Sequence, residues 1–147
     1  MKKILSAGML VLLLNCLSGC SKDSDPAPNT NQGPVALQNT WELRSVYGGY
    51  RTPGTSPNTS PGNKNIWKFT DTTYQQYANG VLYVSGKYTV TKDSSAATGR
   101  IMDALILDKN TSQKLFFEFA NDTLVLYRGI VAADGTIEKF VRVENIK

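Results

Sequence analysis

The sequence contains no histidine and only two cysteines among its 147 residues. Histidine is the commonest general base and a favoured zinc ligand, so its absence excludes most triad hydrolases and zinc enzymes. Both cysteines, Cys16 and Cys20, lie near the start of the chain, which excludes a disulfide framework in the remainder. The sequence also lacks a glycine-rich phosphate loop and a nucleophile elbow. We therefore expect a protein that is not an enzyme and holds no metal or cofactor.

The sequence also lacks a strong excess of positive or negative charge and has no long hydrophobic run. The chain has Lys+Arg 16 against Asp+Glu 12, a formal net charge of +4 at pH 7, and its basic residues form no dense stripe. This balance gives little support for nucleic-acid binding. The apolar run from Ile4 to Leu14 is too short to cross a bilayer, which takes roughly 20 residues. A length of 147 residues fits a single domain.

The beginning of the chain has the pattern of an export signal. A cationic start precedes the apolar run and small residues follow it, which predicts a secretory signal peptide over residues 1–19. Its end, Leu17-Ser18-Gly19-Cys20, resembles the bacterial lipobox. This resemblance implies cleavage before Cys20 and acylation of Cys20 with palmitate-like chains, which would anchor the protein to the membrane. The alternative is an ordinary signal peptide with an incidental cysteine.

Residues 20–36 are expected to form the lipidated cysteine and a flexible tether, because they are polar and rich in proline. The run Lys22-Asp23-Ser24-Asp25 resembles the acidic export signal of surface-exposed lipoproteins in some Gram-negative bacteria. A polar spacer without any export role would give the same composition. Ser21, directly after the lipidated position, resembles an outer-membrane sorting pattern. We therefore expect a lipid-anchored outer-membrane protein, at the cell surface or on the periplasmic face.

The remainder of the chain has the pattern of β-strands. From residue 37 onward, alternation with a period of two and many β-branched and aromatic residues predict short strands and no amphipathic helix. Asn79-Gly80 is the strongest hairpin signal, because both positions of such a turn need positive φ. Closure of the strands would leave no exposed edge. The sequence thus predicts an all-β, eight-stranded antiparallel up-and-down β-barrel, with strands at residues 40–47, 65–70, 72–78, 81–90, 101–107, 114–119, 123–128 and 136–146.

Two polar stretches interrupt the predicted strands. Residues 48–63 form a long loop rich in glycine and proline, and residues 91–100 form a shorter one. A loop longer than about 12–15 residues without regular structure is usually a functional lid or a disordered segment. We expect disorder in the middle of the first loop, over residues 55–61.

The order of short motifs in residues 37–147 resembles the small lipocalin-like domains of Gram-negative lipoproteins. The matching pieces are Leu37-x-Asn39-x-Trp41-x-Leu43-x-Ser45, Trp67-x-Phe69, Tyr88-x-Val90, Asp122-x-Leu124-x-Leu126 and Phe140-x-Arg142-Val143. Asn39 stands where that pattern usually has glycine. The resemblance implies a barrel that binds a small molecule. It also implies that Trp41 packs under Arg142 and closes the floor of the barrel.

Alternation assigns the remaining side chains to two faces. The inward face is expected to hold Trp41, Leu43, Trp67, Phe69, Leu82, Val84, Tyr88, Leu115, Phe117, Phe119, Leu124 and Leu126. The opposite face is expected to hold Tyr74, Tyr83, Phe116, Val125 and Tyr127. Glu42 shares a face with Arg44, opposite Trp41, so it and Glu118 are expected to face water. Nothing in the spacing of the strand acids, Glu42, Asp103, Glu118 and Glu138, brings together a carboxylate pair for catalysis.

Two binding functions remain open. In the first, the barrel binds a small apolar or amphipathic ligand at its mouth, under the loop of residues 48–63. This predicts a cavity of about 300 Å³ or more, lined by Tyr47, Trp67, Tyr77, Tyr88 or Phe117. In the second, the barrel is filled, and its outer face contacts an envelope protein or a glycan. That alternative predicts a contiguous exposed patch that includes Tyr83, Phe116 or Tyr127.

Overall fold

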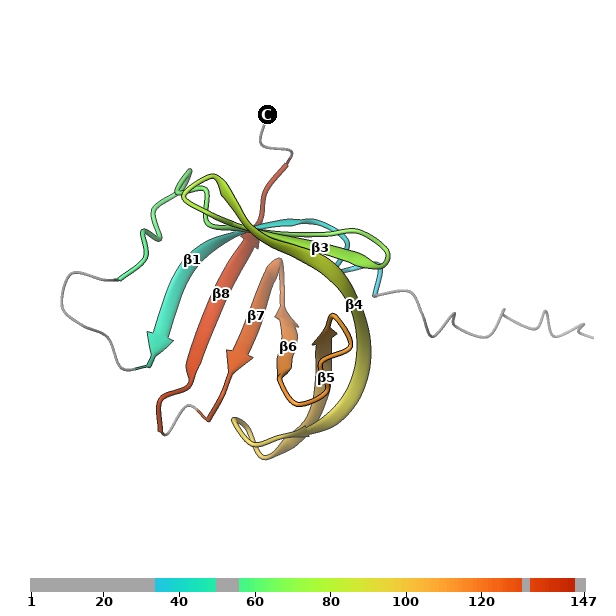
Figure 1. Ribbon diagram of the computed structural model, residues 1–147. Helices are drawn as coiled ribbons and strands as arrows, with labels where there is room; N and C mark the ends of the chain where they lie inside the picture. Colours follow the sequence, from blue (N-terminus) through green and yellow to red (C-terminus); the bar gives the residue numbers. More distant parts are fainter. Residues whose placement is uncertain (1–33, 50–55, 131–132, 145–147) are drawn as a thin grey trace, which may run out of the picture.

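The computed structural model describes residues 34–49, 56–130 and 133–144, and these form one closed β-barrel (Figure 1). Each strand pairs antiparallel with the next, and the last pairs with the first. The predicted all-β, eight-stranded up-and-down barrel is therefore confirmed. The strands are β1 (Thr40–Gly48), β2 (Ile66–Phe69), β3 (Thr73–Ala78), β4 (Val81–Ser95), β5 (Arg100–Leu107), β6 (Lys114–Ala120), β7 (Thr123–Arg128) and β8 (Thr136–Arg142).

The predicted signal peptide, Cys20 and most of the predicted tether lie outside the described residues. Within the part of the chain that the structure describes, no helix is long and apolar enough to cross a membrane.

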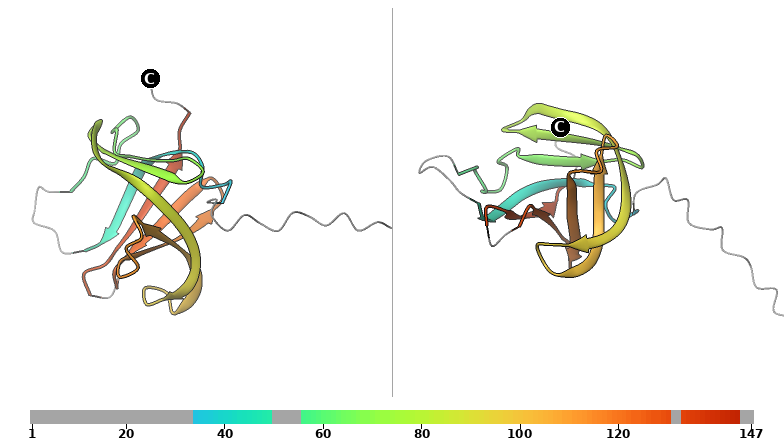
Figure 2. Two further views of the ribbon diagram at one scale, coloured as in Figure 1. Left: turned by 45° about the vertical axis from the view of Figure 1, so that its right-hand side comes forward. Right: turned by 60° about the horizontal axis from the view of Figure 1, so that its bottom comes forward.

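Strand β4 is longer than predicted. Its first half pairs with β3 and its second half with β5, and Figures 1 and 2 show it as a long curved strand that connects the two. The predicted loop over residues 91–100 is therefore wrong, because only residues 96–99 form the turn. Lys92 of β4 and Asp103 of β5 lie opposite each other, with Lys92 Nζ 2.8 Å from Asp103 Oδ1. This ion pair joins the two strands in the polar second half of β4. Strand β8 ends at Arg142, earlier than the predicted residue 146.

The barrel interior holds most of the side chains that alternation assigned to it. The core consists of Leu37, Trp41, Leu43, Trp67, Phe69, Tyr74, Tyr88, Leu105, Leu115, Phe117, Leu124, Leu126 and Phe140, with Val84 and Phe119 partly buried against them. Tyr74 was expected on the outer face, but it is buried because it lies directly opposite Phe69 in the β2–β3 hairpin. Val125 lies opposite Glu118 and Lys139 on the outer face, as predicted, although it is only 5% exposed.

Two β-bulges reverse the expected facing of nearby side chains. The β1–β8 register shifts between Leu43 and Ser45, so Val46 packs against the core and Tyr47 points outward with 71% exposure. The β3–β4 register shifts between Gln76 and Tyr77, and Leu82 is accordingly 49% exposed. An extra residue inverts the two-residue period beyond it. The predicted inward position of Leu82 is therefore wrong, and Tyr47, a predicted lining residue of the barrel mouth, faces outward.

One end of the barrel is closed by the start of β1 and the turn before it. Leu37 is fully buried, and the indole Nε1–H of Trp41 donates a hydrogen bond of 2.9 Å to its carbonyl oxygen. Arg142 lies opposite Trp41 in the β1–β8 pairing, and its Cζ is 6.0 Å from the centroid of the Trp41 ring. The residues of the predicted floor pair, Trp41 and Arg142, thus lie together where the last strand meets the first.

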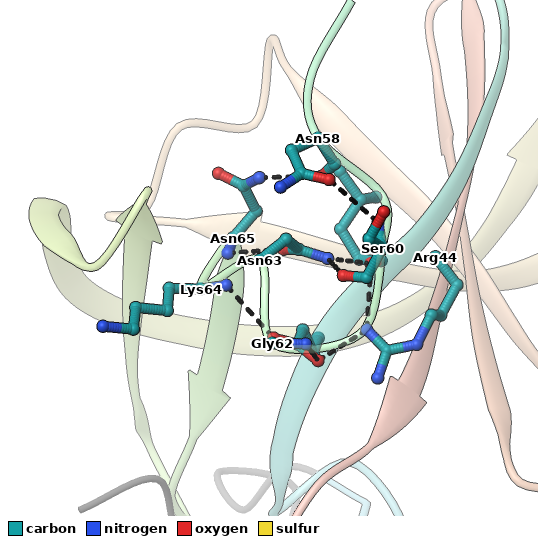
Figure 3. Close-up of polar contacts among 9 residues, drawn as sticks. Arg44, Asn58, Ser60, Gly62, Asn63, Lys64 and Asn65 are labelled. Atoms are coloured by element: carbon teal, nitrogen blue, oxygen red, sulfur yellow. Dashed lines mark hydrogen bonds and ion pairs between the residues drawn. The ribbon is translucent and has the colours of Figure 1, made fainter.

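The described part of the β1–β2 loop is attached to β1 through Glu42, whose partners Arg44, Gly62 and Lys64 are labelled in Figure 3. The carboxylate accepts hydrogen bonds from the backbone N–H groups of Gly62 and Lys64, each at 3.1 Å, and forms an ion pair of 2.5 Å with Arg44. The Asn63 side-chain amide donates to the Leu43 carbonyl oxygen at 2.7 Å. Glu42 is only 2% exposed, so the expectation that it faces water is wrong.

The expected disorder of residues 55–61 is not found in residues 56–61, where Asn58 and Ser60 belong to this polar cluster, and residue 55 lies outside the described residues. The Ser60 backbone N–H donates to Asn58 Oδ1 at 3.0 Å, and the Ser60 carbonyl oxygen accepts from the Asn63 amide at 2.6 Å. The Asn65 side chain donates to the carbonyl oxygen of Asn58 at 3.0 Å. Asparagine side chains replace regular strand pairing as partners for the loop backbone.

Substitution of Glu42 tests this attachment. Burial alone would raise the pKa of Glu42, but the N–H of Lys64, the Arg44 guanidinium and the N–H of Gly62 together lower it below 4.5. The stabilisation is therefore present above about pH 4.5 and is lost as the pH falls through the lower folded-state pKa. We expect Glu42→Gln to reduce the free energy of unfolding at pH 7 by about 1–3 kcal/mol.

Urea unfolding at pH 7 and at several values below pH 4.5 measures both effects. Glu144→Gln is the matched control, because Glu144 is exposed. Equal stabilities of the Glu42→Gln and Glu144→Gln variants, or an unchanged acid dependence in Glu42→Gln, would contradict the role given to Glu42.

Candidate functional site

An ion pair lies inside the barrel at the end opposite Leu37. In β7, Arg128 is two residues after the buried Leu126, so alternation places its side chain inward. In β8, Glu138 is two residues before the buried Phe140 and also points inward. Arg128 Nε donates to Glu138 Oε1 at 2.8 Å, and the side chains are 36% and 17% exposed. Two charged side chains thus lie at the end of the apolar core.

The guanidinium of Arg128 also lies over Trp67. Its Cζ is 5.6 Å from the ring centroid, a geometry worth about 0.5–2 kcal/mol. Trp67 stacks on Phe69 with centroids 5.3 Å apart and planes 5° from parallel, and it touches Tyr74 at 5.6 Å. Trp67 is only 2% exposed, and its Nε1–H has no hydrogen-bond partner among the described residues. A buried N–H without a partner costs about 1–3 kcal/mol, so a ligand oxygen that reached this donor would relieve that cost.

Two open pockets adjoin the ion pair. The larger has a volume of about 610 Å³ and is lined by Tyr74, Leu107, Asp108, Asn110, Ser112, Gln113, Lys114, Leu115, Arg128 and Gly129. The smaller has a volume of about 310 Å³ and is lined by Leu43, Val46, Pro57, Asn65, Ile66, Trp67, Gln76, Tyr77, Ala78, Thr136, Glu138 and Phe140. Arg128 lines the larger pocket and Glu138 lines the smaller one. Each pocket is therefore in contact with one member of the ion pair.

Asp108 forms a second polar contact at the larger pocket. It lies directly after β5 with φ 49°, a left-handed conformation that aspartate tolerates. Oδ2 accepts from the Tyr74 hydroxyl at 2.7 Å, and Oδ1 accepts from the Lys87 N–H at 2.9 Å. Burial, followed by the hydrogen bond to Asp108, raises the pKa of Tyr74 to about 12. The Tyr74 hydroxyl and the Lys87 N–H lower the pKa of Asp108 below 3.8.

The structure places the predicted lining residues in different surroundings. Trp67 and Tyr77 line the smaller pocket, and the hydroxyl of Tyr77 donates to Gln75 Oε1 at 3.0 Å. Tyr88 and Phe117 are each 2% exposed, belong to the packed core and line neither of the two pockets described above.

The outward-facing Tyr47 is likewise absent from the linings of both pockets. The described part of the β1–β2 loop does border the smaller pocket, through Pro57 and Asn65. The polar residues of the site, Arg128, Glu138, Asp108 and Tyr74, were not selected from the sequence, although alternation with Leu124 and Leu126 already places Arg128 inward.

The patch predicted by the alternative function is present in part. Four side chains form a row across the adjacent strands β6, β7, β8 and β1, because each lies directly opposite the next. In this order they are Phe116, Tyr127, Ile137 and Tyr47. The Tyr127 hydroxyl donates to Glu118 at 2.5 Å. Tyr83 is 75% exposed but lies in β4, outside this row.

Comparisons with protein-family models, curated proteins and solved structures found no match. Among residues 34–49, 56–130 and 133–144, no cluster of histidine, cysteine, aspartate and glutamate could hold a metal ion.

Substitution of Gly86 tests the position of Asp108. A methyl group at Gly86 would lie 2.1 Å from Asp108 Oδ1, so the carboxylate would have to move away from Tyr74 and Lys87. We expect Gly86→Ala to lower the free energy of unfolding by about 1–3 kcal/mol.

Urea unfolding measures this effect, and a double-mutant cycle supplies the control. In an Asp108→Ala background the obstacle is gone, so adding Gly86→Ala should cost much less than it does in the native sequence. Additive costs in the cycle would contradict the crowding seen between the two residues.

Proposed function

We propose that this protein is a non-catalytic outer-membrane lipoprotein, anchored through Cys20, whose barrel binds a small amphipathic ligand at the end where Arg128 and Glu138 lie. The observation that carries this proposal is the combination of an interior ion pair, the unpartnered N–H of Trp67 and two adjoining open pockets. The lipocalin-like motifs in the sequence agree with it.

The ion pair supports binding because stability alone does not require it. Well-packed apolar residues usually stabilise an interior as well as a buried ion pair does, and often better. Ligand pockets, by contrast, typically combine an apolar lining with a few fixed polar groups and have volumes of about 300–1,000 Å³. The smaller pocket has this composition, with Leu43, Val46 and Phe140 beside Glu138 and a volume of about 310 Å³.

A binding role also suits the acids near the pockets better than a catalytic one. A general acid must hold its proton near neutral pH, which requires a raised pKa. The pKa of Asp108 is instead lowered by its hydrogen bonds, and Glu138 is paired with Arg128. Both carboxylates are therefore suited to positioning neighbouring donors.

Acylation of Cys20 is a direct test of the anchoring proposal. Mass spectrometry of the protein purified from bacterial envelopes should find a chain that begins at Cys20 and carries the added mass of acyl chains. Cys20→Ser should abolish both the added mass and the membrane association in fractionated cells. An unmodified chain with a different first residue would contradict anchoring.

Binding at the smaller pocket is tested with the fluorescent amphiphile N-phenylnaphthylamine. We expect saturable binding by the full chain with Cys20→Ser, which cannot be acylated. Val46→Phe should weaken binding at least about fivefold by filling the pocket. Val81→Phe is the control, because Val81 is 71% exposed and lies outside the pocket lining. Circular dichroism verifies that each variant is folded, and the absence of saturable binding to the unsubstituted barrel would contradict the proposal.

The outer row of Tyr47, Ile137, Tyr127 and Phe116 favours a second candidate function, contact with an envelope protein or a glycan. The supporting observation is the direct cross-strand pairing of these residues over four adjacent strands. Aromatic side chains on a sheet surface provide rigid apolar contact area, and aromatic residues are enriched in contact surfaces. This face is separate from the interior pockets, so the two functions are compatible.

A further inference from the structure

We propose that the polar group of the ligand is uncharged and accepts hydrogen bonds from Trp67 and Arg128, and that Glu138 discriminates against ligands that carry a carboxylate. This inference rests on the ligand-binding function proposed above and specifies its chemistry. The argument starts from the hydrogen-bonding capacity that remains around the ion pair.

Two donors remain at this site. Trp67 lines the smaller pocket, and its Nε1–H has no partner among the described residues although the side chain is 2% exposed. Arg128 makes one hydrogen bond within the described part of the chain, from Nε to Glu138, so its terminal guanidinium nitrogens retain their donor capacity. An oxygen atom of a ligand is the complement of these donors.

One acceptor also remains. Oε1 of Glu138 accepts hydrogen bonds from Arg128 Nε and, at 3.5 Å, from the Thr136 hydroxyl. No hydrogen bond to Oε2 of Glu138 is found among the described residues. A carboxylate oxygen only accepts hydrogen bonds, so Oε2 favours a ligand group that donates. A hydroxyl or an amide both donates and accepts, whereas a carboxylate only accepts.

The charges lead to the same preference. Arg128 and Glu138 neutralise each other, so an ionised group that entered the smaller, mainly apolar pocket would meet no free opposite charge among its lining residues, which is unfavourable. A ligand carboxylate would in addition meet the like charge of Glu138. Repulsion of this kind is an effective way for a binding site to reject a close analogue.

Decanamide and decanoate are suitable probes because they share one alkyl tail and differ in a single polar atom. Isothermal titration calorimetry uses the full chain with Cys20→Ser at neutral pH, where decanoate is ionised. We expect decanamide to bind roughly tenfold more tightly than decanoate. Glu138→Gln keeps an acceptor for Arg128 but removes the negative charge, so it should tighten decanoate binding roughly tenfold and reverse or erase the preference.

Two further variants separate the contributions. Trp67→Phe keeps an aromatic ring but removes the N–H, and it should weaken decanamide binding about threefold to tenfold, as expected for one hydrogen bond. Glu118→Gln is the matched control, because Glu118 is a glutamate paired with an arginine, Arg100, outside both pocket linings. It should leave the affinities for both probes unchanged.

The outcomes separate this inference from the proposed function. Equal or tighter binding of decanoate to the unsubstituted barrel would overturn the inference and leave ligand binding intact. The same holds if a folded Glu138→Gln variant keeps the original preference. If neither probe binds, and N-phenylnaphthylamine does not bind either, the proposed function fails and the inference fails with it. If only N-phenylnaphthylamine binds, the inference alone is overturned.

Discussion

The closed ring of antiparallel pairings is the constraint on which every other feature of this barrel depends. Once β8 pairs with β1, each strand position belongs either to the interior or to the outer face, and a side chain can change sides only where the register shifts. Closure also fixes which residues meet across strands distant in sequence. Trp41 and Arg142 are the clearest example, since they are separated by nearly the whole domain and lie opposite each other.

This constraint explains how far the fold could be predicted from the sequence. The two-residue period and the turn signals are local, so the number of strands and most of the core follow from them. A β-bulge depends on how two strands fit together, and neither Leu43-Ser45 nor Gln76-Tyr77 carries a local signal for one. The facing of Leu82 was therefore mispredicted and the outward position of Tyr47 was not foreseen, although the strands that contain them were found. The length of β4 was missed for a similar reason. Its second half is polar, and polar residues can be assigned to a strand only when the residues that pair with them are known.

The candidate site was predictable in part. Alternation from Leu126 and Phe140 places Arg128 and Glu138 inside, but the prediction that they form an ion pair requires the register of β7 against β8. The contact between Asp108 and Gly86 was not predictable, because it joins the end of one strand to the bend of another. Glu42 shows the same limit on the outer face. Glu42 does lie on the face opposite Trp41, as predicted, but it is buried because a loop folds back over β1.

The two buried tryptophans of the barrel interior lie directly opposite each other in β1 and β2, yet their surroundings differ. Near the start of β1, Leu37, Trp41 and the neighbouring Phe119 fill the space, and the only polar group of the Trp41 ring is bonded to Leu37. Trp67 lies directly opposite Trp41 in the β1–β2 pairing, but its N–H has no partner among the described residues, and Arg128 and the smaller pocket lie beside its ring. Two buried indoles in one barrel thus differ in whether the fold satisfies their hydrogen-bonding group. Most buried polar groups in proteins have a hydrogen-bond partner. Among the described residues Trp67 Nε1 and Ser95 Oγ have none, and only Trp67 lies beside the ion pair and lines a pocket there, which supports the ligand site proposed at that place.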